Sequence, residues 1–285
     1  GTPTNLATRK YLNTKGIPQI LLAAGATKLT DPTQFPWTMS WQPNYFDEAS
    51  TYAKRILADK PEAKIAMMYA NDDSGKDYAT GFKAGLGEKA SLLVSEETYD
   101  TSEPTVTSQL ARLKSSGAEA FFFHATPKFG AQIIRGIHEL GWKPATFVAQ
   151  TASSVAGVIE PAGYEAAQGI ISSAYLKDAT DAQWADDQET KDWRAWMAKY
   201  HPKGDVNDYL NVYAYAQAWC LVKILEQAGQ NPTRKAIMAS ATNVHFRVPM
   251  VLPGITLETS KADYRLIKKV RLMKFEGKHW VLLPE

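Results

Sequence analysis

The feature that most constrains the fold is a short apolar run that ends in a polar loop. Residues 65–69 (IAMMY) are all apolar, and residues 71–75 (NDDSG) follow them almost at once. A strand that is buried on both faces has such a composition, and strands of this kind belong to parallel sheets. The polar residue types favour turns and helix N-caps. Tyr78, Phe82 and Leu86 then recur at a spacing of four, which predicts an amphipathic helix.

This unit of strand, loop and helix repeats along the chain. Further strands are expected near Leu92, Ala120 and Thr146, at roughly 27-residue intervals, which is the period of a strand plus a crossover helix. The last connecting helix is the best marked, because Pro127 stands at its start and Gly141 just beyond its end. The pattern predicts an α/β fold with a doubly wound parallel sheet, in which ligands bind at the carboxyl ends of the strands.

Beyond residue 174 the pattern changes. A long helix is expected over residues 207–228. Its apolar positions fall on one stripe: Leu210, Ala214, Ala218, Leu221 and Leu225. Extended segments follow over residues 267–275 and 280–283, with a hairpin turn between them. A chain of 285 residues with 45% hydrophobic content is long enough for one large domain or two lobes.

Composition argues against several classes of protein. The net charge is +2, and Lys and Arg are scattered, so nothing points to a nucleic-acid partner. The single cysteine, Cys220, rules out an internal disulfide, and its apolar helical setting predicts a buried thiol. No apolar run reaches the roughly 18 residues of a membrane span.

The sequence also carries no recognisable catalytic or cofactor motif. It has no GxGxxG after a strand, no GxxxxGK[ST] and no GxSxG. The five histidines lie far apart and show no metal-ligand spacing. Adjacent acids such as Asp72 and Asp73 are expected to cap a helix. We therefore expect no enzyme, no cofactor and no metal, with an enzyme built from distant residues as the disfavoured alternative.

Seven segments, in this order and spacing, resemble the leucine/isoleucine/valine-binding-protein family. Its members are type I periplasmic binding proteins, which deliver solutes to ABC transporters. No single segment is specific to the family, but the order and spacing of the seven segments together are. The segments are 16–18 (GIP), 24–27 (AGAT), 70–76 (ANDDSGK), 113–118 (LKSSGA), 140–141 (LG), 252–256 (LPGIT) and 275–280 (FEGKHW).

The resemblance implies two α/β lobes joined by three crossovers, each lobe a doubly wound parallel sheet. Lobe I would hold residues 1–42 and 175–268, and lobe II residues 43–174 and 269–285. The first strand–helix units of the family pattern are not seen, so we expect lobe I to be incomplete and an N-terminal part to precede Gly1. The family also implies a periplasmic location, a signal peptide outside this sequence, a permease partner and a monomer.

Ligand contacts follow from the resemblance position by position. In lobe I, the family holds the ligand's carboxylate with hydroxyl and backbone N–H groups at positions that match Thr2, Ala26 and Thr27. In lobe II, family members that bind amino acids carry aromatic residues at the positions of Ser74 and Ala125. This sequence has small residues at both positions, which implies room for a bulkier ligand.

The family's acid, which pairs with the ligand's α-ammonium group, is replaced by Thr151, beside Gln150. Burying an ammonium group without a carboxylate partner costs several kcal/mol. We therefore expect a small carboxylate without an amino group, with aromatic acids favoured. Tyr209 is a candidate to stack on the ligand ring, as are Trp41 and Tyr45.

Two alternatives stay open at this point. If Asp72 or Asp73 turned inward, it would restore an ammonium partner, and the ligand would be a branched-chain or other amino acid. The same fold also serves as the ligand-sensing domain of receptors. His124 is a further candidate contact, to a phenol or a carboxylate.

Overall fold

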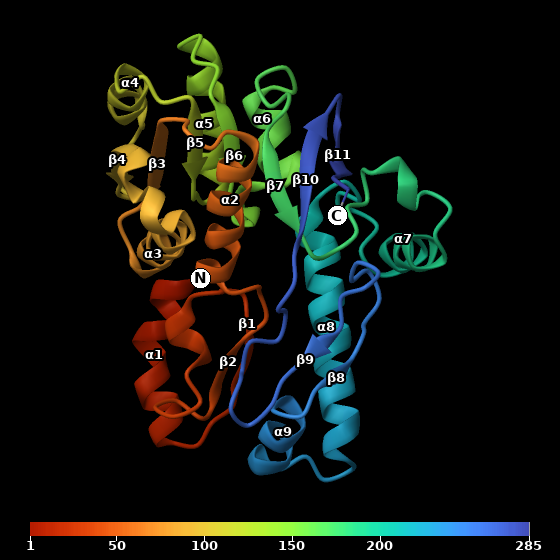
Figure 1. Cartoon of the computed structure of the whole chain (residues 1–285). Coiled ribbons are helices and arrows are strands. Elements are labelled where there is room, and N and C mark those ends of the chain that lie inside the picture. The colour runs from red at the N-terminus through yellow and green to blue at the C-terminus, as the bar shows by residue number, and fades with distance from the viewer. Residues whose placement is uncertain (285) are drawn as a thin grey trace.

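Seven strands form the main sheet of the structure, a computed structural model that describes residues 1–284 (Figure 1). Their order across the sheet is β11-β10-β7-β6-β5-β3-β4. The first five along the chain pair in parallel, and the last two pair antiparallel at one edge. The strands are β3 (Ile65–Ala70), β4 (Leu93–Tyr99), β5 (Ala120–Phe123), β6 (Ala145–Val148), β7 (Ile171–Ala174), β10 (Arg271–Glu276) and β11 (His279–Leu282).

Helices cover both faces of this sheet. Successive strand residues point to opposite sides, so apolar strands need packing partners on both faces. Met67 and Phe122 pack in one buried cluster with residues of α2 and α3. Met68 and Phe123 pack in another with residues of α4 and α5. As the apolar runs predict, β3 and β5 are buried along their whole length. The helices are α2 (Tyr45–Asp59), α3 (Asp73–Leu86), α4 (Thr107–Ser115) and α5 (Pro127–Glu139).

Short elements complete this half of the molecule, which we call the large-sheet part. They are η2 (Gly87–Leu92), η3 (Gln150–Ala152), η4 (Val155–Ile159) and α6 (Glu160–Ala162). The remaining chain, called the small-sheet part, contains the parallel pair β1 and β2. Its elements are α1 (Thr2–Thr14), β1 (Gln19–Leu22), η1 (Thr27–Thr30), β2 (Thr38–Ser40), η5 (Ala182–Trp184), α7 (Gln188–Tyr200), α8 (Tyr209–Ala228), α9 (Arg234–Ala241), β8 (His245–Phe246) and β9 (Leu257–Glu258).

The chain passes between the two parts three times (Figure 1). It leaves β2 for α2, leaves β7 for the segment before α7, and returns from β9 to β10. All three passages lie near the middle of the molecule, so the carboxyl ends of β3, β5 and β6 come close to the loops of the small-sheet part.

Helix α8 corrects one detail of the sequence prediction. Leu210, Leu221 and Leu225, which the pattern places on one apolar stripe, are exposed. The face that packs inward is a different one: Tyr209, Val212, Tyr213, Ala216, Cys220 and Ile224. The helix is apolar nearly all round, so periodicity alone does not select its buried face. The buried thiol of Cys220 is confirmed. Within residues 1–284, none of the helices combines the length and apolar composition that spanning a membrane requires.

Candidate functional site

The polar loops at the carboxyl ends of β3, β5 and β6 face the small-sheet part across a contact region. The backbone N–H of Tyr45 donates to the Gly25 carbonyl at 2.9 Å, and Ser154 Oγ donates to Asp208 Oδ1 at 3.0 Å. The fit at Gly25 is tight, since a Cβ atom there would lie 2.1 Å from the carbonyl oxygen of Pro43. These contacts hold the loops of the two parts against one another.

A stack of three aromatic rings lies on the large-sheet side of this region. Tyr78 is in the middle, with its ring centroid 4.4 Å from that of Tyr45 and 4.6 Å from that of His124. The Tyr45 hydroxyl donates to Gln42 Oε1 at 2.7 Å. Tyr45 opens α2, Tyr78 belongs to α3, and His124 follows β5. The spacing of the rings therefore depends on how these three elements pack.

Buried polar atoms without a hydrogen-bond partner gather around this stack. Ring centroids of Trp41 and Tyr209 lie 6.3 and 6.5 Å from that of Tyr213. The hydroxyls of Tyr175 and Tyr209 influence one another's pKa without completing a well-formed hydrogen bond. The unpartnered atoms of this region are Thr2 Oγ1, Trp41 Nε1, His124 Nδ1 and the hydroxyls of Tyr175, Tyr209 and Tyr213. We call these six residues the site cluster.

Burial decides the charge state of the site cluster. It lowers the pKa of His124 to about 4, against the attraction of Asp72, so the imidazole is neutral at pH 7. It raises the pKa of the hydroxyls of Tyr175, Tyr209 and Tyr213, which therefore stay protonated. The cluster offers hydroxyl and indole donors and a neutral imidazole. Such a set suits a ligand with acceptor oxygens.

A buried carboxylate lies next to the ring stack. Glu48, on α2, is only 2% exposed. It accepts four hydrogen bonds: from Tyr52 OH and Tyr78 OH, both at 2.7 Å, from the Gln150 backbone N–H at 2.8 Å, and from Ser173 Oγ at 3.0 Å. Burial raises the pKa of Glu48 above its ordinary value, although the four donors oppose the rise.

The predicted carboxylate contacts of lobe I lie in two different settings. Thr2 is buried, with its hydroxyl near that of Tyr45, and Ala26 is buried in the same apolar cluster as Tyr45. Thr27 is exposed, and its backbone N–H and hydroxyl donate to Asp77 Oδ2 at 2.8 and 3.1 Å. Thr2 thus borders the ring stack, Ala26 belongs to the buried cluster around it, and Thr27 is bound by a carboxylate of α3.

The two small residues that are predicted to line the site from lobe II are both buried. Ser74 donates through its backbone N–H and its hydroxyl to Asp72 Oδ1, at 2.8 and 2.5 Å, and so belongs to the N-cap of α3. Ala125 is fully buried in the core. Aromatic rings reach this region from the neighbouring positions Tyr78 and His124 instead.

The remaining predicted contacts lie close to these groups. Gln150 is buried and its backbone N–H binds Glu48, while the Thr151 hydroxyl donates to the carbonyl of Ala125 at 3.1 Å. Tyr209, the first residue of α8, is a member of the site cluster. The structure therefore brings predicted residues that are far apart in the sequence, from Thr2 to Tyr209, to one region.

Sequence reasoning did not single out Glu48, Tyr78 or Tyr175 as site residues. One signal was available for Glu48, because it lies three residues after Tyr45 and four before Tyr52, on the buried face of α2. A glutamate on an apolar stripe is unusual unless it has buried partners. The tyrosines carry no comparable signal, since each fits an ordinary core position.

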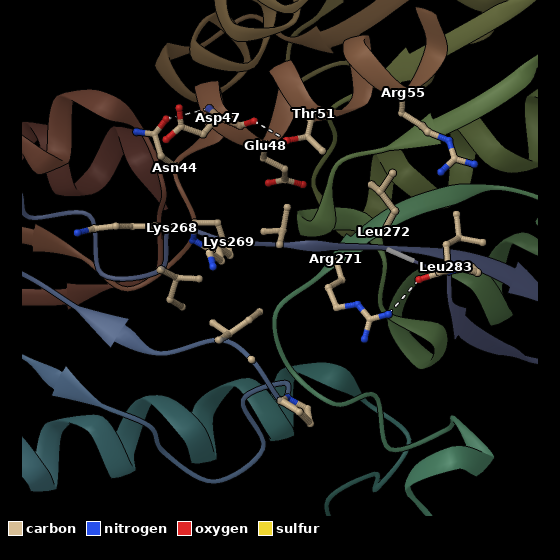
Figure 2. A pocket seen from close by; sticks show the side chains of 17 residues that line it. Asn44, Asp47, Glu48, Thr51, Arg55, Lys268, Lys269, Arg271, Leu272 and Leu283 are labelled. Carbon is tan, nitrogen blue, oxygen red and sulfur yellow. Dashed lines mark hydrogen bonds between the residues drawn. The ribbon is translucent and has the colours of Figure 1, made fainter. Parts of the chain in front are cut away.

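A groove of about 630 Å³, which Glu48 helps to line, lies between α2 and the third passage (Figure 2). One wall comes from α2, with Asp47 and Arg55, and the opposite wall from the third passage, with Lys268 and Lys269. Arg55 pairs with Asp59 and Lys268 with Asp263, so these cations have carboxylate partners. The groove holds none of the unpartnered atoms of the site cluster.

Metal chemistry finds no support in the described residues. Within residues 1–284, no group of three or more His, Cys, Asp or Glu side chains is arranged to hold an ion. The donor set of the site cluster, mainly hydroxyls, suits an organic ligand.

Solved structures of similar fold extend over the whole chain. A possible leucine/isoleucine/valine-binding protein from Rhodopirellula baltica SH 1 has a TM-score of 0.85 at 19% identity, covering 100% of this chain and 75% of that one. A branched chain amino acid ABC transporter protein from Thermus thermophilus with bound valine has a TM-score of 0.87 at 17% identity, covering 100% and 76%. An ABC transporter solute binding protein from R. palustris in complex with 4-hydroxybenzoate has a TM-score of 0.80 at 17% identity, covering 100% and 74%.

These likenesses confirm the predicted fold class. No curated protein sequence matches the chain. The sequence pattern of the periplasmic binding protein family, in contrast, matches residues 1–279, which is nearly the whole length. The resemblance seen in the sequence is thereby confirmed, and the chain belongs to the periplasmic binding protein family.

Proposed function

We propose that this chain captures a small carboxylate, preferably an aromatic acid, and delivers it to an ABC importer. The observation that carries the proposal is the site cluster, in which six buried side chains have polar atoms that make no well-formed hydrogen bond. Four of these atoms lie near other polar groups: Thr2 near Tyr45, Tyr175 near Tyr209, and Tyr213 near Gln42. Nearly all buried polar groups in native proteins are hydrogen-bonded, so a bound ligand is the natural partner. The protein would act outside the cytoplasm, as a periplasmic monomer, and a membrane permease would be its partner.

The proposed ligand would lie between two lobes. Lobe I would comprise residues 1–42 and 175–268, and lobe II residues 43–174 and 269–285, of which residue 285 lies outside the described residues. Both parts of the molecule contribute to the site cluster, since His124 comes from the large-sheet part and Tyr209 from the small-sheet part. A ligand that contacts both would favour the closed state over an open one.

An aromatic acid is favoured by the chemistry of the cluster. Its donors suit a carboxylate, and the stacked rings of Tyr45, Tyr78 and His124 are suitable stacking partners for a flat ligand ring. An α-ammonium group would need a free carboxylate, yet Glu48 already has four donors. The 4-hydroxybenzoate bound to the R. palustris protein has this combination of ring and carboxylate.

Amino acids remain the second candidate because of one observation. Asp72 lies near both Tyr45 and His124, close enough to act on their pKa values. Its Oδ1 atom accepts the bonds of the α3 N-cap, and its second oxygen could pair with an ammonium group. The valine bound to the Thermus thermophilus protein is a ligand of this type.

A thermal-shift panel on the full-length gene product tests the proposal. It compares 4-hydroxybenzoate, benzoate and cinnamate with valine and leucine. A ligand at 100 times its Kd stabilises the protein by about 2.7 kcal/mol, which raises Tm by several degrees, at roughly 2–4 °C per kcal/mol. We expect shifts with the aromatic acids. A shift with valine or leucine alone would favour the second candidate, and no shift with any acid would overturn both.

A further inference from the structure

Glu48 is the most connected buried ionisable side chain beside the site cluster. Its four donors come from four separate places: Tyr52 on α2, Tyr78 on α3, Gln150 in η3 and Ser173 on β7. Two of these donors are 102 and 125 positions away along the chain. One carboxylate therefore ties together the first passage, the loop after β6 and the strand that leads into the second passage.

The bond to Tyr78 links Glu48 to the ring stack. Tyr78 OH donates to Glu48 Oε2 at 2.7 Å, while its ring stacks between Tyr45 and His124. The other three donors all use Oε1, so Oε2 is occupied by Tyr78 alone among the described residues. Glu48 thus fixes the hydroxyl end of Tyr78, and stacking on Tyr45 and His124 fixes the orientation of its ring.

The bonds to Gln150 and Ser173 link Glu48 to the rest of the contact region. Gln150 begins the loop that carries Thr151, and Ser173 lies two residues before Tyr175 of the site cluster. A shift of the carboxylate would displace the Gln150 backbone and the Ser173 side chain relative to the ring stack. Glu48 itself touches no atom of the site cluster through a hydrogen bond, so it would act through these partners.

A buried carboxylate is a costly way to obtain stability alone. Moving a carboxylate out of water costs several kcal/mol even after relaxation, and well-packed apolar residues often replace such groups without loss of stability. Fully satisfied buried polar networks instead tend to fix one arrangement of their members. A role in binding for the arrangement of Tyr78, Gln150 and Ser173 would account for the desolvation cost of the buried Glu48.

We propose that Glu48 is a positioning residue for ligand recognition, which holds the Tyr78 ring, and with it His124, in the geometry that accepts a flat acid. This inference rests on the proposed function. In this proposal Glu48 does not contact the ligand. It fixes the spacing and tilt of the stacked rings of Tyr45, Tyr78 and His124.

The test uses two matched tyrosine variants of the full-length protein. Tyr78→Phe and Tyr52→Phe each remove one hydroxyl that donates to Glu48 at the same distance. Only Tyr78 stacks on His124, whereas Tyr52 packs on Phe122 and Phe147. Comparable losses of unfolding free energy are expected from both, so stability cannot explain a difference in binding.

Two readouts decide the outcome. The His124 imidazole resonance, assigned by its loss in His124→Gln, reports the ring stack without any ligand. Isothermal titration with 4-hydroxybenzoate reports recognition. We expect Tyr78→Phe and Glu48→Gln to move the resonance and to raise Kd by about fivefold, the equivalent of one hydrogen bond. Tyr52→Phe should leave both close to wild type.

The failures of the two proposals are distinguishable. If Tyr78→Phe and Tyr52→Phe give the same His124 resonance and the same Kd for 4-hydroxybenzoate, Glu48 only supports the fold. The positioning role is then overturned. If the wild-type protein binds no acid of the panel, the proposed function fails, while the imidazole resonance still decides whether Glu48 sets the ring stack.

Discussion

Thr27 and Asp77 are joined by two hydrogen bonds that end on a single oxygen. The backbone N–H and the hydroxyl of Thr27 donate to Asp77 Oδ2 at 2.8 and 3.1 Å. Thr27 opens η1 in the small-sheet part, and Asp77 lies on α3 in the large-sheet part. The family resemblance assigns these two donors to the carboxylate of a ligand, so Asp77 occupies them in the way a ligand would.

Removing the Asp77 carboxylate is therefore expected to strengthen binding of an acid. In Asp77→Ala the backbone N–H of Thr27 becomes free, while its hydroxyl keeps Asn44 Oδ1, at 3.4 Å, as an acceptor. We expect the Kd for 4-hydroxybenzoate to fall by about three- to tenfold. Isothermal titration measures the change. Asp73→Ala is the matched control, because it removes an exposed carboxylate paired with Lys28 and leaves Thr27 untouched. Equal effects of the two variants would point to net charge and speak against competition for Thr27.

Thr151 stands where amino-acid binders of the family carry an acid. Thr151→Glu would restore a partner for an α-ammonium group, at a half-buried position whose present hydroxyl bonds to the Ala125 carbonyl. We expect this variant to gain a thermal shift with leucine and to lose part of its shift with benzoate. Thr151→Gln, which has the same size without the charge, should show neither the gain with leucine nor the loss with benzoate. A wild-type protein that already prefers leucine would contradict the premise.

Burial of Glu48 makes stability depend on pH in a defined direction. Because burial raises the pKa of Glu48 in the folded protein above the usual 4.5, its contribution to stability is most favourable below that value. This contribution is lost as pH rises through the folded pKa. Each unit of pKa elevation costs about 1.4 kcal/mol once the group is ionised in both states.

Urea unfolding of wild type and Glu48→Gln from pH 4 to pH 8 measures this contribution by difference. The free energy of unfolding of wild type should fall relative to that of the variant as pH rises. Other carboxylates titrate alike in both proteins and cancel. A relative increase with pH would mean that the four donors outweigh burial, and that the pKa of Glu48 is lowered.

Close packing of α2 on α3 predicts a sensitive glycine. A Cβ atom at Gly81 would lie 2.2 Å from the carbonyl oxygen and 2.5 Å from the Cα atom of Phe46, which are backbone atoms that cannot rotate away. We expect Gly81→Ala to lower the free energy of unfolding by about 1–3 kcal/mol, even though alanine favours helices.

Gly136→Ala on α5 is the matched control for this variant. Among the described residues, the nearest atoms to its added Cβ would be Leu110 Cδ1, at 2.5 Å, and Leu110 Cγ, at 4.0 Å, and a side-chain end can move. Its loss should be smaller than that of Gly81→Ala in the same urea melts. A reversed order would show that the α2–α3 contact yields more easily than the structure indicates.

Much of the fold could be read from the sequence because its signals are local. Continuous apolar runs such as residues 65–69 and 120–123 become central strands, and polar residues stop them where the chain must turn. The boundary signals at Pro127 and Gly141 agree with α5 to within two residues. Strands and helices can be told apart because their apolar residues recur with different periods. The repeated unit of strand, loop and helix then predicts a parallel sheet, with the loops gathered at the carboxyl ends of its strands.

The apolar face of α8 was harder to predict for a physical reason. Leu210 and Leu225 satisfy the helical period as well as Val212 and Ile224 do, and only the neighbouring elements decide which set is covered. Tertiary packing overrides a pattern that is nearly uniform around the helix.

What the sequence determined by itself is the order of strands and helices, the family and the loops that could hold a ligand. What only the tertiary structure decided is which side chains of those loops meet. Gln150 and Ser173 reach Glu48 across 102 and 125 positions of chain, and Asp77 reaches Thr27 across 50. Such contacts leave no periodic trace in the sequence, because each residue's local pattern is satisfied equally well with a different partner.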